Sequence, residues 1–380
     1  MRYSNFKEKK LSKMGFGTLR LPLNIEGTEP DYIAIEKMVD IALGGGINYF
    51  DTGYSYAKEK AEVALGKALK RHPRNSYYLA DKLPTWRCKS PDDVKEIFED
   101  QLKKCDTDYF DFYLIHSIKE KRYEEIAKYK VMEQLKDEVK KGRIIHLGAS
   151  AHCGPELLRE LLETYGEDLE FIQLQLNYMD WEFAEAKELH KIAVEFDKPI
   201  MVMEALRGGM LANPISDSAR EVLSEITSGT TYPSLGYRFV EGLQNVAVVL
   251  SGVSNTGEVK QNIDIFNERP LSAYEKETIL KAAKVLARDI MVPCTACDYC
   301  SECPQKIKIS KIFATYNEAA ASGFNRPWMP LSKDYKVFEK NAKDCRKCGL
   351  CEAHCPQNIK IIEQLKKIDD KYAELEEKGK

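Results

Sequence analysis

The chain has 380 residues, 43% of them hydrophobic, so it can bury a large core and has room for two domains. Its 57 basic and 60 acidic residues give a formal net charge of −3, which excludes a charge-based case for binding nucleic acid or an anionic membrane surface. No apolar run approaches the roughly 18 residues that span a bilayer, and no apolar leader opens the chain, so we expect a cytoplasmic protein without a membrane segment.

Short β-rich runs alternate with helical patterns before the cysteine-rich tail. The β-rich runs span residues 14–21, 47–51, 77–80, 110–116, 144–150, 171–176, 200–204 and 246–252. The helical patterns between them span residues 33–43, 58–69, 91–104, 129–141, 155–164, 183–196 and 217–225. Strands that alternate with helices in this way predict an α/β fold, a parallel (β/α)8 TIM barrel, which we place at residues 1–285.

A doubly wound open sheet is the alternative architecture. Such sheets commonly bind a dinucleotide through a G-x-G-x-x-G segment that follows the first strand and opens a helix, and this chain has none there. The glycines at residues 44–46 instead follow a helical pattern, so we interpret them as a helix C-cap and turn. The barrel is therefore the favoured architecture.

Polar side chains stand at or just after the ends of three predicted strands. Asp51 closes the second strand, Lys82 follows the third and His116 closes the fourth, while Tyr56 lies in the loop after Asp51. Because barrels carry their catalytic groups at the C-terminal ends of the strands, we expect these four side chains to meet. Taken singly, each has a structural explanation: Asp51 as a turn residue, Lys82 as a solvated loop charge and His116 as a hydrogen-bonded histidine.

Together, these four side chains can act as a general acid for carbonyl reduction, or as a base for alcohol oxidation. A lysine ammonium beside a tyrosine hydroxyl favours the phenolate and lowers a pKa that starts near 10. A carboxylate paired with that lysine keeps it charged and in place. A nearby imidazole can orient a carbonyl oxygen or share the proton.

Eight of the 11 cysteines form two runs near the C-terminus, and a proline follows each run. The runs consist of Cys294, Cys297, Cys300 and Cys303, and of Cys345, Cys348, Cys351 and Cys355. The chain contains an internal repeat, because the segment Cys-Pro-Gln-Lys-Ile-Lys-Ile at 303–309 nearly matches Cys-Pro-Gln-Asn-Ile-Lys-Ile at 355–361. Three thiolates at this spacing wrap one corner of an iron–sulfur cluster, and the fourth reaches the neighbouring cluster. We therefore predict a ferredoxin-like domain with two [4Fe–4S] clusters at residues 286–380.

Zinc is the main alternative ligand, because four-cysteine zinc sites also use C-x2-C pairs. Zinc ribbons usually separate two such pairs by a long hairpin, whereas each run here is short and ends in Cys-Pro, which favours clusters. The first run departs from the usual ferredoxin spacing by one residue before Cys303. Beyond the second run, the apolar residues form a helical stripe that we expect to pack on this chain, at 361, 365, 368, 372 and 375.

Several segments resemble the aldo/keto reductase family. They are Met14-Gly-Phe-Gly-Thr18, Phe50-Asp51-Thr52-Gly53-x2-Tyr56, Asp81-Lys82-Leu83-Pro84, and the segments at residues 107–116 and 141–150. With the cysteine-rich tail, the chain looks like the branch of this family that appends a two-cluster ferredoxin domain. The resemblance implies a catalytic tetrad in which Tyr56 donates the proton, Lys82 tunes Tyr56, Asp51 holds Lys82 and His116 positions the carbonyl.

The same resemblance implies an NAD(P) site. Ser150 and Gln173 match the residues that hold the nicotinamide amide, and Met203 stands where the family commonly has a stacking aromatic ring. The pyrophosphate loop and the adenosine-closing segment would be represented by Leu206, Gly208, Gly209, Ser254 and Asn262. NADPH-specific members place basic residues where this chain has Gly252 and Glu258. A carboxylate repels the 2′-phosphate, so NADH is favoured over NADPH.

The two halves pose a chemical mismatch. A nicotinamide passes a hydride, two electrons at once, whereas each cluster passes one, and a flavin that could do both has no visible motif here. We expect an oxidoreductase of the aldo/keto reductase type for a small carbonyl or alcohol substrate, whose clusters link the site to an electron-transfer protein partner. The alternative is a non-catalytic redox-sensing or electron-transfer subunit whose barrel binds nucleotide.

Overall fold

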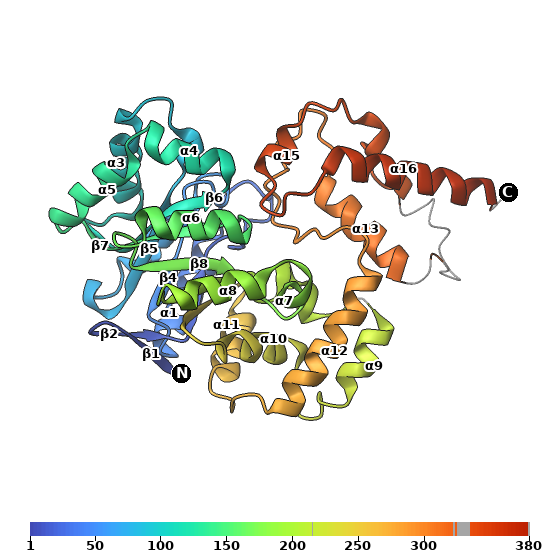
Figure 1. Cartoon of the computed structure of the whole chain (residues 1–380), viewed down its shortest axis with the longest axis horizontal. Helices are drawn as coiled ribbons and strands as arrows, with labels where there is room; N and C mark the ends of the chain where they lie inside the picture. Colours follow the sequence, from blue (N-terminus) through green and yellow to red (C-terminus); the bar gives the residue numbers. More distant parts are fainter. Residues whose placement is uncertain (215, 322–323, 325–334, 379–380) are drawn as a thin grey trace. The chain divides into compact units, whose positions relative to one another are not determined.

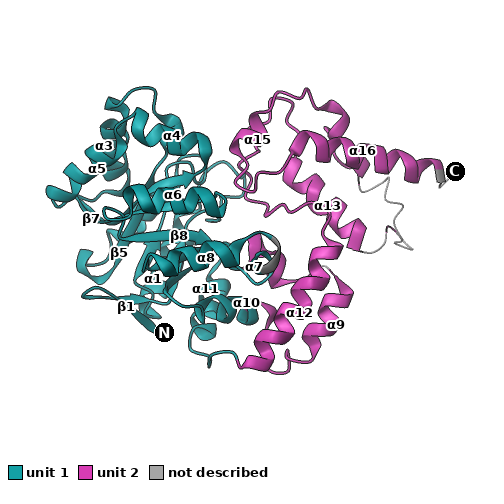
Figure 2. Cartoon of the chain, in the orientation of Figure 1, with its two compact units in different colours: residues 1–205, 234–271 teal, residues 206–233, 272–380 magenta. Residues whose placement is uncertain are grey.

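The computed structural model describes residues 1–214, 216–321, 324 and 335–378. The chain divides into two compact units, drawn in different colours in Figure 2. The first unit comprises Met1–Ala205 and Ser234–Leu271, and the second comprises Leu206–Pro233 and Ser272–Lys380. The predicted domain boundary at residues 285 and 286 stays a prediction, since these units follow spatial contacts and are discontinuous in sequence.

Eight parallel strands close into a barrel in the first unit (Figure 1). Around the barrel their order is β10-β3-β4-β5-β6-β7-β8-β9, and β10 pairs with both β9 and β3. The strands are β3 (Met14–Gly17), β4 (Tyr49–Asp51), β5 (Tyr78–Leu83), β6 (Phe110–Ile118), β7 (Ile144–Ala151), β8 (Phe171–Gln175), β9 (Ile200–Met203) and β10 (Val246–Gly252). The predicted (β/α)8 barrel is confirmed, and each strand lies within or beside its predicted range.

A short antiparallel hairpin that the sequence analysis missed precedes the barrel. Its strands are β1 (Tyr3–Phe6) and β2 (Lys9–Ser12). The Phe6 ring lies 5.2 Å from that of Phe112 and 6.1 Å from that of Phe171, within a buried apolar cluster. Because Phe171 and Tyr49 begin their strands, this cluster fills the N-terminal end of the barrel. The polar strand ends lie at the opposite end.

Helices follow the strands in the order that a (β/α)8 barrel requires. They are α1 (Tyr32–Gly44), α2 (Ala61–Leu69), α3 (Asp92–Cys105), α4 (Glu120–Lys128), α5 (Val131–Lys140), α6 (Pro155–Tyr165), α7 (Asp180–Phe183), α8 (Ala186–Glu195), α10 (Tyr232–Glu241) and α11 (Thr256–Ile265). The Asp31 side chain caps α1, and Gly46 adopts a φ of 87° just beyond it, as predicted for the glycine turn. Helix α10 was missed, because Pro233 and Gly236 interrupt its helical pattern.

In its described residues, the second unit contains helices and no strand. It contains α9 (Asp217–Ser224), α12 (Ala273–Asp289), α13 (Ile309–Ala321), η4 (Ala342–Asp344), α15 (Leu350–His354) and α16 (Ile361–Lys378). The predicted apolar stripe of α16 is confirmed as an internal packing face, since Ile361, Leu365, Ile368 and Tyr372 are buried in one core cluster. No helix in the described part of the chain is long and apolar enough to cross a membrane.

Candidate active site and cysteine pockets

A buried ion pair lies at the C-terminal end of the barrel. The Lys82 ammonium donates to Asp51 Oδ1 at 2.7 Å and to the Thr52 carbonyl oxygen at 2.5 Å. Lys82 is fully buried, and Asp51 is 3% exposed. Burial raises the pKa of Asp51 above its usual value, while the Lys82 charge opposes that rise. The pair therefore fixes an ammonium group in a site where it has lost its water.

Tyr56 lies beside this ammonium group. The distance from Lys82 Nζ to the centre of the Tyr56 ring is 5.1 Å. On another side, the edge of the Tyr56 ring meets the His116 ring, with centroids 5.9 Å apart. The structure thus brings together Asp51, Tyr56, Lys82 and His116, the four side chains that the sequence analysis expected to meet.

The loop that carries Tyr56 is held in an uncommon backbone conformation. Residues 57–59 all have positive φ values, between 47° and 67°, which costs about 1–2 kcal/mol for each L-residue in this region. The Tyr56 carbonyl oxygen accepts the amides of Lys60 and Ala61 at 3.2 Å, which ties the loop to the start of α2. A Cβ atom at Gly53 would lie 3.1 Å from the Tyr56 ring, so glycine makes room for the ring.

His116 is a neutral imidazole in this environment. Burial lowers its pKa well below 6.5, and the charges of Lys82 and Arg122 lower it further. Its Nδ1 atom is buried and has no hydrogen-bond partner among the described residues. The Trp86 ring lies 5.1 Å from the imidazole, so this tryptophan borders the site. A neutral ring here can make a hydrogen bond without adding charge.

A second layer of polar groups holds the Lys82 backbone and was missed by the sequence analysis. Gln101 Nε2 donates both to the Lys82 carbonyl oxygen and to Glu62 Oε1, at 3.0 Å each. The Lys82 amide donates to the Asp81 carboxylate at 2.8 Å. Burial raises the pKa of both Asp81 and Glu62, and the charge of Glu62 raises the pKa of Asp81 further. The available signal was a charged Glu62 on the otherwise apolar face of α2.

Three of the expected nicotinamide-binding residues lie together on neighbouring strands. Ser150 on β7 pairs in register with Gln173 on β8, and Gln173 pairs with Met201 on β9. The Met203 sulfur lies 3.5 Å from Gln173 Nε2 and 4.0 Å from Ser150 Oγ. Gln173 Oε1 is buried and has no partner among the described residues. This oxygen is a free acceptor of the kind that a carboxamide N–H would satisfy.

The expected pyrophosphate loop follows β9 and belongs to the second compact unit. Gly208 and Gly209 have φ values of 67° and 96°, and the Gly209 amide donates to the Leu206 carbonyl oxygen at 2.9 Å. No atom lies within 4 Å of a Cβ placed on Gly209, so a ligand can approach the backbone closely there. Arg207 is buried, and its guanidinium donates to the Pro293 carbonyl oxygen at 3.2 Å, directly before the first cysteine run.

The expected adenosine-closing residues are split between the barrel wall and the surface. Asn262 is buried and donates to Ser251 Oγ at 2.9 Å. Ser254 is exposed, and its amide donates to the Glu258 carboxylate at 2.7 Å. Glu258 thus lies in the first turn of α11, where its charge is held beside Ser254.

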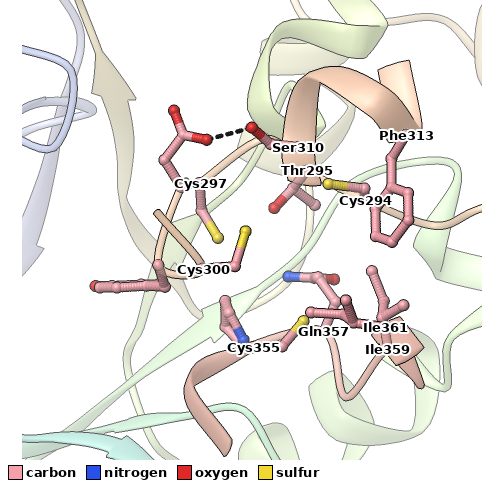
Figure 3. Close-up of a pocket in the computed structure, with 13 residues that line it drawn as sticks. Cys294, Thr295, Cys297, Cys300, Ser310, Phe313, Cys355, Gln357, Ile359 and Ile361 are labelled. Atoms are coloured by element: carbon pink, nitrogen blue, oxygen red, sulfur yellow. Dashed lines mark hydrogen bonds between the residues drawn. The ribbon is translucent and has the colours of Figure 1, made fainter. Parts of the chain in front are cut away.

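Four cysteines surround one pocket in the second unit (Figure 3). Its lining includes Cys294, Cys297 and Cys300 of the first run and Cys355 of the second run. The pocket contains about 310 Å³ of empty space, counted with the solvent at its mouth. Figure 3 shows the four cysteine side chains around this one space.

The remaining four cysteines surround a second pocket in the same unit. Its lining includes Cys345, Cys348 and Cys351 of the second run and Cys303 of the first run. The pocket contains about 550 Å³ by the same measure. Each run therefore sends its Cys-Pro cysteine into the other run's pocket. Within the described residues, no three His, Cys, Asp or Glu side chains converge on a single metal-ion position.

The two runs repeat in backbone conformation as well as in sequence. In each run the first cysteine sulfur accepts the amide two residues later at 3.4 Å, from Ala296 in one case and from Lys347 in the other. Left-handed φ values recur at matching positions, namely Ala296 and Lys347, Asp298 and Gly349, and Lys306 and Asn358. The sequence repeat is therefore a structural repeat.

Solved structures share the barrel fold of this chain. An aldo-keto reductase of Bacillus halodurans in its holo form matches with a TM-score of 0.63 at 24% identity, over 74% of this chain and 96% of that one. The glycerol dehydrogenase AKR11B4 of Gluconobacter oxydans matches with a TM-score of 0.60 at 22% identity, over 74% and 93% of the two chains. At this identity the likeness concerns the fold.

Curated sequences match the same region. The NADH-specific methylglyoxal reductase of Escherichia coli (strain K12) is 26% identical over 327 residues, which cover 73% of this chain and 96% of that protein. The uncharacterized oxidoreductase YqkF of Bacillus subtilis (strain 168) is 24% identical over 72% of this chain and 93% of its own length. A probable aldo-keto reductase 1 of Glycine max is 30% identical over 160 residues, 40% of this chain and 44% of that protein.

Two family models match the chain in succession. The model of the aldo/keto reductase family covers residues 13–284, well over half of the chain. A model described as a 4Fe-4S dicluster domain covers residues 293–360, which include all eight cysteines of the two runs. The chain therefore belongs to the aldo/keto reductase family, and it carries a 4Fe-4S dicluster domain after the barrel.

Proposed function

We propose that the barrel catalyses the reduction of a small carbonyl compound, or the reverse oxidation of an alcohol, with Tyr56 as the proton donor. The buried Lys82 ammonium beside the Tyr56 ring is the observation that carries this proposal. Asp51 holds the Lys82 ammonium in place, and the ammonium stabilises the phenolate that forms when Tyr56 releases its proton. His116, being neutral, can hydrogen-bond the same substrate oxygen without competing as an acid.

We propose that the hydride comes from a nicotinamide cofactor held by Ser150, Gln173 and Met203. The partnerless Gln173 Oε1 atom and the open approach to Gly209 support this assignment. Leu206 and Gly208 shape the same loop, and Ser254 and Asn262 complete the proposed nucleotide contacts. The Glu258 carboxylate next to Ser254 favours NADH over NADPH, and the name of the E. coli relative points the same way.

We propose that each cysteine pocket binds one [4Fe–4S] cluster. One ligand set is Cys294, Cys297, Cys300 and Cys355, and the other is Cys345, Cys348, Cys351 and Cys303. Bound clusters supply one-electron transfer. The proposed domains are a barrel at residues 1–285 and a cluster domain at residues 286–380, which links the barrel chemistry to a one-electron partner either directly or through a flavin.

Anaerobically reconstituted protein tests these assignments together. Iron and sulfide analysis should give two [4Fe–4S] clusters per chain, and stoichiometric zinc would contradict the cluster assignment. NADH oxidation with a panel of small aldehydes and ketones should show turnover in the parent and a loss of roughly 100-fold or more in Tyr56→Phe. Tyr54→Phe is the matched control, because Tyr54 lies in the same loop and its ring packs on Lys104.

The alternative, a non-catalytic redox-sensing or electron-transfer subunit, makes a different prediction. In that case nucleotide binds, but no carbonyl compound is turned over, and Tyr56→Phe behaves as the parent does. The observation that favours this second candidate is Met203, which stands where the family commonly has an aromatic ring that stacks on the nicotinamide.

A further inference from the structure

The two cysteine runs have matching backbone conformations, but their cysteines differ in solvent exposure. Of the eight cysteines in the two runs, Cys348 is the one that is exposed, while the others are buried or intermediate. Cys348 lines the second pocket, and Leu350 follows it at 49% exposure. A cluster in the second pocket would therefore reach the protein surface at Cys348.

The two pockets also differ in charge. Between its cysteines the second run carries exposed Arg346 and Lys347 together with Glu352, whereas the first run carries Asp298 and Glu302 and no basic residue. The segment at residues 303–309 contributes Cys303 and Ile307 to the lining of the second pocket, and it also carries two exposed lysines, Lys306 and Lys308.

The two acidic residues closest in sequence to Arg346 and Lys347 have partners of their own. The Asp344 carboxylate accepts the Asn341 amide at 2.9 Å and lies 3.5 Å from Lys340. The Glu352 carboxylate accepts the Ile362 amide at 2.9 Å. Among the residues that the structure describes, no ion pair involves Arg346 or Lys347. The surface formed by Arg346, Lys347, Cys348 and Leu350, which we name the basic face, therefore keeps its positive charge.

We propose that the basic face is the docking site of an acidic one-electron carrier protein, and that electrons enter or leave this chain there. An exposed apolar side chain surrounded by charges has the composition of a small protein–protein contact. Opposite charges on two proteins accelerate their encounter and orient it. This proposal rests on the proposed function, because it requires a cluster in the second pocket.

The electron transfer at this face is balanced in itself. The reduced carrier gives up one electron and becomes oxidised, and the oxidised cluster at the second pocket gains that electron. No proton or other atom is transferred, and the reverse reaction returns the electron to the carrier. The exposed Cys348 gives the short route between the two proteins.

Stopped-flow reduction of the anaerobic holoprotein by an acidic flavodoxin tests the proposal, with cluster bleaching as the readout. The second-order rate constant of the parent should fall as ionic strength rises. Arg346→Glu/Lys347→Glu should lower this rate constant by about 10-fold or more at low salt. The matched control is Lys284→Glu/Arg288→Glu, which reverses the same two charge types at exposed positions of α12 and should stay near the parent.

A small uncharged donor, photoreduced deazaflavin, separates docking from cluster loss. Both variants should be reduced by it at the parental rate, which shows that the clusters are intact. Equal flavodoxin rates for the two variants would overturn the proposal. So would a parental rate that does not depend on salt, or faster low-salt reaction with basic cytochrome c as the acceptor.

The outcomes also separate this proposal from the proposed function. Salt-dependent reduction by flavodoxin without any carbonyl turnover would support the docking site and contradict the enzymatic assignment. Carbonyl turnover with no effect of the Arg346→Glu/Lys347→Glu change would do the opposite. Absence of iron and sulfide from the purified parent would contradict both.

Discussion

The barrel site and the cysteine pockets are built in different ways. In the barrel, the proposed catalytic groups are held by other side chains: Lys82 is bound to Asp51, and its backbone is bound to Asp81 and Gln101. In the second unit, the cysteines surround open space, and the sulfurs of Cys294 and Cys345 each accept a backbone amide. The barrel side chains are thus positioned by one another, whereas the cysteines are arranged around a space that a bound group would fill.

This difference concerns folding as well as chemistry. The barrel strands are buried on both faces, so their packing alone can stabilise the closed sheet. In the second unit, buried Cys355 belongs to the apolar core cluster, and five other cysteines pack against it. Ligand binding that fills such a core contributes directly to its folding free energy. We therefore expect the barrel to be stable alone and the cluster unit to depend on iron.

The largest expected effect comes from removing iron. Oxidation and chelation of the clusters should lower amide protection in α13 and α16 by 100-fold or more, roughly 3 kcal/mol or more of local stability. Strands β4–β8 should keep their protection. Hydrogen exchange of the two forms measures both regions in one sample. Unchanged amide protection of α16 in the iron-free form would contradict the expectation that the second unit depends on iron for its stability.

The next largest effect concerns the buried ion pair. Lys82→Met leaves Asp51 charged and buried without its partner, which should cost about 3–5 kcal/mol in the free energy of unfolding. Asp51→Asn/Lys82→Met removes both charges and should recover part of that stability, while carbonyl turnover stays at least about 100-fold below the parent. Urea unfolding and steady-state rates check the two effects separately. Full recovery of turnover in the double variant would contradict the role of Lys82.

A smaller effect concerns pH and His116. The pKa of His116 is lowered in the folded state, so below pH 6.5 the unfolded chain binds a proton that the folded chain refuses. Stability should therefore fall as pH drops below 6.5, with a contribution from this residue that approaches about 1.4 kcal/mol per pH unit. His116→Asn should flatten the slope by that amount. Denaturation curves between pH 5.5 and 7.5 measure it, and identical slopes would exclude a neutral buried His116.

The smallest effect sharpens the contrast between the two cysteine pockets. Asp298→Gly keeps the left-handed backbone that Gly349 adopts at the matching position and removes a negative charge. The reduction potential of the cluster in the first pocket should rise by roughly 1 kcal/mol per electron, and the other potential should stay constant. Redox titration followed by electron paramagnetic resonance measures both. Ser310→Ala is the control, because it removes the hydrogen bond to Asp298 but leaves the Asp298 carboxylate in place. A lower reduction potential of the cluster in the first pocket of Asp298→Gly would contradict this electrostatic prediction.

Sequence alone determined the features that depend on local pattern. Alternating strands and helices predicted the barrel, and the spacing of Cys294–Cys303 and Cys345–Cys355 predicted two four-cysteine sites with an exchanged ligand. Strand ends predicted that Asp51, Lys82 and His116 would meet, because parallel strands in a barrel bring their C-terminal ends to one rim. Each of these patterns is complete within a few neighbouring residues or within one topological rule.

Only the tertiary structure decided the features that arise from contacts between distant segments. The N-terminal hairpin carries few apolar residues, and its packing on Phe112 and Phe171 exists only once the barrel has closed. Glu62 lies on α2 and Asp81 on β5, and their side chains meet only in the folded chain, so neither residue alone predicts their shared burial. The exposure of Cys348 is likewise a property of the folded loop, because Cys297 holds the matching place in the cysteine spacing and yet is less exposed.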